Sequence, residues 1–91
     1  MVMILYHATT AKKAQRYHHS GCIISPVRGF NTLTAAMFWS MKTRRTVIYR
    51  FDADNSYKLP DHHNKFGTAW WNDGDIPVDK IQCVVSVEPA K

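Results

Sequence analysis

The stretch TVIYRFD, residues 46–52, decides the fold class of this chain. Its side chains alternate, with Val47, Tyr49 and Phe51 on one side and Ile48 and Arg50 on the other, which is the pattern of a β-strand. Helical patterns precede this stretch and further strand patterns follow it. The chain is therefore predicted to combine helices and strands in one sheet.

A strand and a helix are predicted at the start of the chain. Residues 2–6 are rich in β-forming side chains and run into Thr9 and Thr10, either of which can cap a helix. Gly21 is expected to end that helix. Residues 22–24 then form a short predicted strand.

A second helix follows a predicted turn over residues 25–29. Asn31, Thr32 or Thr34 can cap its start. Its predicted packing face carries Leu33, Ala36, Met37, Ser40 and Met41. Three cations close it, at the end where the helix dipole favours positive charge: Lys42, Arg44 and Arg45.

The part after residue 52 reads as further strands and turns. A brief strand is predicted over 57–59, a loop over 60–67 and a final strand over 81–87. The whole chain, residues 1–91, is thus expected to be a single α+β domain. Two helices would pack on a small, mixed or largely antiparallel sheet of about five strands.

Charge is distributed unequally along the sequence. Residues 1–51 contain eight basic side chains and no acidic one, whereas residues 52–91 contain four basic and seven acidic side chains. A folded molecule with this polarity attracts anions over a Debye length of about 10 Å. The expected partner is an anionic ligand, a nucleotide or RNA.

The sequence indicates a cytoplasmic protein without a membrane partner. Its apolar start, residues 2–5, is too short for a signal peptide core or a membrane span. Cys22 and Cys83 lie in apolar runs and are expected to be free thiols. His62 and His63 are adjacent in a predicted loop and would point apart, so no metal site is predicted.

Three short motifs carry a family resemblance: LYHATT at residues 5–10, GFNT at 29–32, and DIP at 75–77 followed by Ile81. They resemble the ADP-ribosyltransferase superfamily, which includes poly-ADP-ribose polymerases, DNA-modifying toxins and RNA 2'-phosphotransferases. The resemblance implies NAD as a candidate cofactor and His7 as the catalytic residue that contacts the ribose. The family's catalytic glutamate would fall near Thr68 or Ala69, neither of which carries charge.

The expected site surrounds His7. Its predicted ligand-binding residues are Thr9, Lys12, Lys13, Arg16, Arg28, Asn31, Thr32, Arg44, Arg45 and Trp70. Basic side chains would bind phosphates, and an exposed tryptophan can stack a base at roughly 1–3 kcal/mol. If residues 69–71 form a strand, Trp70 and Trp71 point to opposite faces.

Three functions are consistent with these residues. The favoured one is a small basic binding domain for a nucleotide or RNA on a degenerate ADP-ribosyltransferase-like scaffold. The alternative is an active enzyme, either an NAD-dependent transferase or a small toxin-like ribonuclease that uses His7 and a neighbouring histidine as acid and base. The third is a homodimeric interaction domain formed through an exposed tryptophan and the Met-rich second helix.

Overall fold

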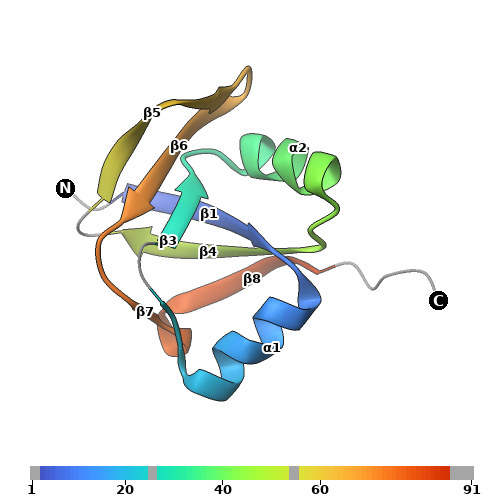
Figure 1. Cartoon of the computed structure of the whole chain (residues 1–91), viewed down its shortest axis with the longest axis vertical. Helices are drawn as coiled ribbons and strands as arrows, with labels where there is room; N and C mark the ends of the chain where they lie inside the picture. Colours follow the sequence, from blue (N-terminus) through green and yellow to red (C-terminus); the bar gives the residue numbers. More distant parts are fainter. Residues whose placement is uncertain (1–2, 25–26, 54–55, 87–91) are drawn as a thin grey trace.

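A six-stranded antiparallel sheet forms the centre of the molecule, with its strands in the order β5-β6-β3-β1-β4-β8 (Figure 1). The computed structural model describes residues 3–24, 27–53 and 56–86, and describes residues 56–64 by their backbone. The six strands are β1 (Met3–Thr9), β3 (Val27–Phe30), β4 (Val47–Ala53), β5 (Ser56–Asn64), β6 (Gly67–Asn72) and β8 (Ile81–Ser86).

The described residues also form two helices, a small strand pair and a single helical turn. Helix α1 spans Ala11–Ser20 and helix α2 spans Leu33–Thr43. Strand β2 (Cys22–Ile23) pairs with β7 (Ile76–Pro77), and the 3-10 turn η1 (Val78–Lys80) follows. The predicted α+β fold with two helices on a largely antiparallel sheet is confirmed, with six strands in the main sheet where about five were expected.

Both helices begin at the threonine caps that the sequence allows. The Oγ1 atom of Thr10 accepts a hydrogen bond from the Lys13 amide at 3.1 Å, and that of Thr32 accepts one from the Ala35 amide at 3.1 Å. Helix α1 ends at Gly21, whose left-handed φ of 89° favours glycine. Local sequence therefore sets these boundaries.

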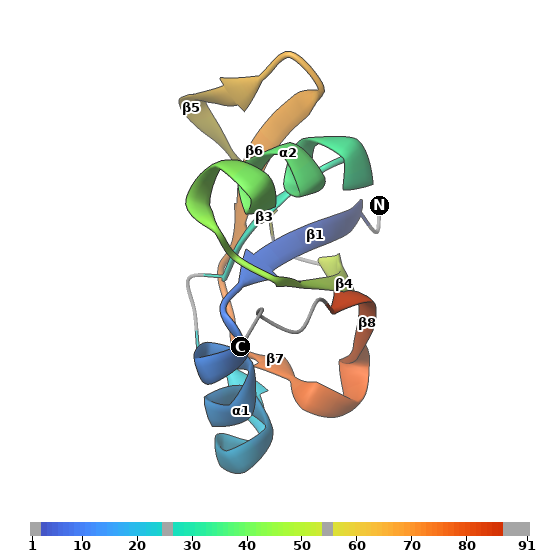
Figure 2. The ribbon, with the colours of Figure 1, turned by 90° about the vertical axis from the view of Figure 1, so that its right-hand side faces the viewer.

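The two faces of the sheet are covered by different helices. One face carries Leu5 and Phe51, which pack with Ile23 and Val27, while α1 joins this side through Tyr17. The other face carries a second cluster of buried residues, Ala8, Ala36 and Ile48, beneath α2. Figures 1 and 2 show α2 and α1 at separate ends of the molecule, with β1 and β4 between them in Figure 1.

The predicted packing face of α2 is wrong in part. Met37 and Met41 are exposed, whereas Ala35 and Ala36 are fully buried. Because alanine has no side chain beyond Cβ, the helix can approach the sheet closely on its alanine side. The larger apolar side chains then lie toward solvent.

Two segments that were predicted to be a turn and a loop are strands. Val27–Phe30 forms β3 between β1 and β6, and β5 continues to Asn64. Hydrogen bonding to neighbouring strands overrides the local turn signals in both. Pro60 is tolerated because β5 is an edge strand whose register shifts between Lys58 and His63.

Within the described ranges, neither helix is long and apolar enough to cross a membrane.

Candidate functional site

His7 lies near the end of β1 and bonds to the neighbouring strand β3. In the described ladder these strands pair at Tyr6 and Phe30. Beyond that pair, the Nδ1 atom of His7 lies 2.6 Å from the carbonyl oxygen of Arg28. A carbonyl only accepts hydrogen bonds, so Nδ1 carries the proton.

The other ring nitrogen of His7 faces a tyrosine. In the neutral imidazole Nε2 is an acceptor, and the hydroxyl of Tyr17 on α1 lies 3.2 Å away and donates to it. The hydroxyl of Thr9, which is 1% exposed, lies 3.3 Å from that of Tyr17 and completes the chain of hydrogen bonds. Both nitrogens of His7 are therefore engaged within the fold.

The electrostatic surroundings keep His7 neutral. Burial is the main cause that lowers its pKa below the usual value of 6.5, although the hydrogen bond to the Arg28 carbonyl acts in the opposite direction. The charges of Arg45 and Lys13 lower this pKa further. Two cations therefore lie close enough to His7 to act on its protonation.

Lys13 lies in the first turn of α1, where positive charge is unfavourable. The first turn of this helix contains no acidic residue, although the helix dipole favours one there. Lys13 follows the Thr10 cap by three residues, the position at which a glutamate would complete a capping box. The chain thus places a cation where helix stability favours an anion.

Arg45 reaches the same corner from the end of α2. Arg44 ends the helix with a left-handed φ of 58°, and the Arg45 amide donates to the Ser40 carbonyl at 2.9 Å. The Nη1 atom of Arg45 donates to the carbonyl of Ala8 at 3.4 Å. This contact brings the guanidinium to the end of β1.

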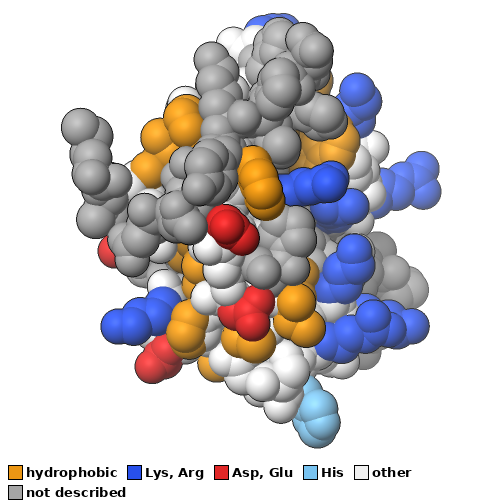
Figure 3. All heavy atoms as spheres, turned by 60° about the vertical axis from the view of Figure 1, so that its left-hand side comes forward, with side chains coloured by type: hydrophobic (Ala, Val, Ile, Leu, Met, Phe, Trp, Pro, Cys, Tyr) orange, Lys and Arg blue, Asp and Glu red, His pale blue; other side chains and the backbone are white. Residues whose placement is uncertain are grey.

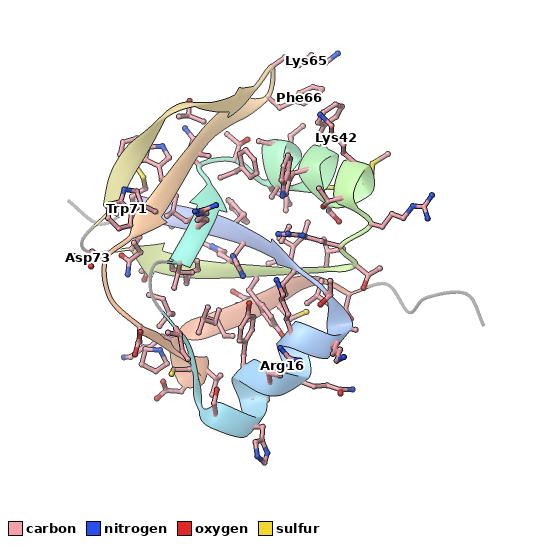
Figure 4. All side chains as sticks on the ribbon, in the orientation of Figure 1. Arg16, Lys42, Lys65, Phe66, Trp71 and Asp73 are labelled. Atoms are coloured by element: carbon pink, nitrogen blue, oxygen red, sulfur yellow. The ribbon has the colours of Figure 1, made fainter. Side chains whose placement is uncertain are left out.

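Basic side chains gather on one side of the molecule. Figure 3 shows most of the visible Lys and Arg side chains along its right-hand edge, and the acidic ones at its centre and left. On this face, most of the described basic side chains are thus separated from the acidic ones. The basic side chains are nevertheless spread over the molecule, since Figure 4 shows Arg16 on α1 well apart from Lys42 on α2.

A row of residues crosses the α1 face of the sheet through His7. The strand registers place Trp70, Gly29, His7, Tyr49 and Cys83 side by side. A Cβ atom on Gly29 would lie 3.0 Å from the backbone oxygen of Tyr6, so a side chain here would be tightly crowded by the neighbouring strand. No side chain therefore separates Trp70 from His7 along the row.

Trp70 carries an unsatisfied donor. Its ring packs against the core cluster, and its Nε1 atom is buried without a hydrogen-bond partner among the described residues. Such a donor costs about 1–3 kcal/mol. Trp70 therefore offers an N–H group at one end of the row. Trp71 points to the opposite face beside Arg28, as expected for adjacent residues of a strand.

Sequence reasoning missed two tyrosines of this site. Tyr17 and Tyr49 meet edge to face with ring centroids 6.4 Å apart, and the Tyr49 hydroxyl lies 3.3 Å from Nε2 of His18. Burial raises the pKa of Tyr49. The sequence did place both tyrosines on the predicted inward faces of their helix and strand. Because a buried tyrosine hydroxyl needs a hydrogen-bond partner, that placement could have pointed to them.

Apart from Trp70, the predicted site residues divide into three groups. His7, Thr9, Lys13 and Arg45 meet at the corner between β1 and α1. Lys12, Arg16, Arg28 and Arg44 have exposed side chains. Asn31 and Thr32 hold the turn between β5 and β6, since the Asn31 Oδ1 atom accepts from the Thr68 amide and the Thr32 hydroxyl donates to the Phe66 carbonyl.

The described residues lack a glutamate at the position that the resemblance implies, and they lack a metal-binding cluster. Thr68 and the buried Ala69 occupy β6 where the resemblance would place a glutamate. Among the described residues, His, Cys, Asp and Glu form no group of three or more that could hold a metal ion. The side chains of His62 and His63, and the whole of Glu88, lie outside the described part of the chain.

Comparisons with models of known protein families, with curated proteins and with solved structures gave no match to this chain.

Proposed function

We propose that this protein is a small basic domain that binds a phosphate-bearing ligand, a nucleotide or RNA, at the corner between β1 and α1. One observation carries the proposal. Lys13, in the first turn of α1, and Arg45, which donates to the Ala8 carbonyl, both lower the pKa of His7, in a part of the chain that contains no acidic residue, residues 1–51. This combination of cations and a helix N-terminus favours bound negative charge.

Each residue has a distinct role in this proposal. Lys13 supplies a mobile ammonium group and Arg45 a planar guanidinium that can contact two phosphate oxygens. His7 positions the end of β1 against β3 and α1 through its two hydrogen bonds. Trp70 lies in the same row and carries a buried N–H without a partner among the described residues.

The ADP-ribosyltransferase-like scaffold is part of the same proposal. His7 at the end of the first strand and the GFNT run entering α2 support it. Thr68 and Ala69 do not fit the transfer reaction, because neither side chain can stabilise the positive charge that develops on the ribose. We therefore favour binding of NAD or RNA over ADP-ribose transfer.

An amide chemical-shift titration tests the proposal. NAD and a 5'-phosphorylated oligoribonucleotide are titrated separately, so that the two ligand sources are distinguished. Saturable shifts are expected at the amides of residues 11–13 and at the Trp70 indole. For RNA, affinity should also fall between about 50 and 200 mM salt as counterions are displaced.

A double variant and a matched control sharpen this test. Lys13→Ala combined with Arg45→Ala should weaken binding about tenfold or more, whereas Lys80→Ala, at an exposed position of η1, should not. Circular dichroism confirms that the variants fold. Equal binding by the double variant, or no shifts with either ligand, would reject this site.

A further inference from the structure

Helix α2 exposes large apolar side chains toward solvent. Met37 is 44%, Phe38 40% and Met41 78% exposed, and Phe66, on the turn between β5 and β6, is 39% exposed. These four residues are called here the α2 patch. Contiguous exposed apolar patches on soluble proteins mark interaction sites.

The α2 patch is held in place by hydrogen bonds. The Phe66 and Phe38 rings lie with centroids 5.4 Å apart. The Thr32 hydroxyl donates to the Phe66 carbonyl at 2.8 Å, and the Asn31 side chain accepts from the Thr68 amide at 2.9 Å. The turn thus fixes Phe66 against α2, which lowers the entropy cost of binding a partner there.

Positive charge surrounds the α2 patch. The Lys65 ammonium lies 5.2 Å from the centroid of the Phe66 ring. Lys42 follows Phe38 by one helical turn, and Arg44 follows Met41 at the helix end. Figure 4 shows Lys65, Phe66 and Lys42 where the β5–β6 turn meets α2. The sequence of α2 contains no acidic residue.

We infer that the α2 patch docks an acidic, amphipathic segment of a partner protein. Apolar side chains of that segment would cover Met37, Phe38 and Met41, while its carboxylates would face the surrounding Lys and Arg side chains. A second copy of this chain is disfavoured, because it would bring the same positive rims together. This inference is independent of the anion site near His7.

Selection from a displayed library of random 16-residue peptides tests the inference. Peptides are selected on the full chain and their affinities are measured at low and physiological salt. The expected binders are amphipathic helices. They carry Leu, Phe or Met three or four residues apart on one face, with Asp or Glu beside that face. No enrichment, or enrichment without acidic residues, would overturn the inference.

Surface variants locate the docking site. Met41→Glu and the double reversal Lys42→Glu with Lys65→Glu should each weaken the selected peptides about tenfold or more. Ile24→Ala is the matched control, because Ile24 is an exposed apolar side chain outside α2 and the β5–β6 turn. Equal losses in the control, or no loss in Met41→Glu, would contradict docking at the α2 patch.

Two other binding partners of the α2 patch would give different results in these experiments. Sedimentation of the wild type as a dimer that Met41→Glu converts to a monomer would assign the α2 patch to self-association. Loss of oligoribonucleotide binding in Met41→Glu, with no peptide selected, would assign it to nucleic acid. Either result would replace the acidic partner segment.

Discussion

His7 and Arg28 join two strands beyond the point where their backbone ladder pairs. The Nδ1 atom of His7 donates to the Arg28 carbonyl at 2.6 Å, one residue past the pairing of Tyr6 with Phe30. The same imidazole accepts from Tyr17 on α1. A single side chain thus ties β1 to both β3 and the first helix.

Replacing His7 should therefore destabilise the fold. His7→Ala is expected to lower the free energy of unfolding by about 1–3 kcal/mol, because it removes the hydrogen bonds to the Arg28 carbonyl and to the Tyr17 hydroxyl. His7→Asn should recover part of this loss, since its amide can still donate toward Arg28. Urea denaturation measures both, with the exposed His19→Ala as control. A loss in that control as large as in His7→Ala would contradict a specific role.

The stability of the protein should fall as pH falls below about 7. Because burial lowers the pKa of folded His7 below its usual 6.5, the unfolded chain binds the proton first. The contribution of His7 is thus complete above 6.5 and is lost as pH falls toward its folded pKa. Denaturation at several pH values, compared with His7→Asn, measures this slope. An identical slope in the variant would exclude His7 as its source.

Lys13→Glu should raise the stability of the fold and weaken ligand binding. A glutamate three residues after Thr10 completes a capping box and favours the helix dipole, which should raise stability by about 0.3–1 kcal/mol. The same change removes a cation near His7 and should raise the pKa of that histidine. Binding of NAD or RNA should weaken. Thermal unfolding and an NMR titration of His7 check these effects, with Lys80→Glu as control.

If Lys13→Glu bound the anionic ligand as tightly as the wild type, Lys13 would have no part in the proposed site. A gain in stability with unchanged binding would then mean that Lys13 destabilises the start of α1 and has no role in the ligand site.

Gly67→Ala should break the hydrogen bonds that hold the turn between β5 and β6. A Cβ atom there would lie 2.7 Å from Asn31 Oδ1 and 2.8 Å from Thr32 Oγ1, so both side chains would have to move away from their hydrogen bonds. Loss of these two bonds should destabilise the fold by about 1–3 kcal/mol. Amide exchange at Thr68 should also become faster. The control is Thr34→Ala at an exposed position of α2, and protection at Thr68 equal to the wild type would contradict this arrangement.

The sequence determined those features that depend on neighbouring residues. The alternation of residues 46–52 predicted β4, and Gly21 predicted the end of α1. The sequence also placed the helix starts to within a few residues, at Thr9 or Thr10 and at Asn31, Thr32 or Thr34, because caps act within one turn. The separation of charge and the absence of a glutamate at Thr68 or Ala69 also required no coordinates.

Only the tertiary structure decided which elements and side chains meet. Val27–Phe30 and the later part of β5 became strands through pairing with β6, and turn residues gave no sign of those partners. The burial of Ala35 and Ala36, which leaves Met37 and Met41 exposed, depends on how closely α2 approaches the sheet.

The bonds of His7 to Arg28 and Tyr17 join residues 21 and 10 positions apart. Periodicity and capping describe contacts within a few residues, so these bonds arise only when β1, β3 and α1 pack together.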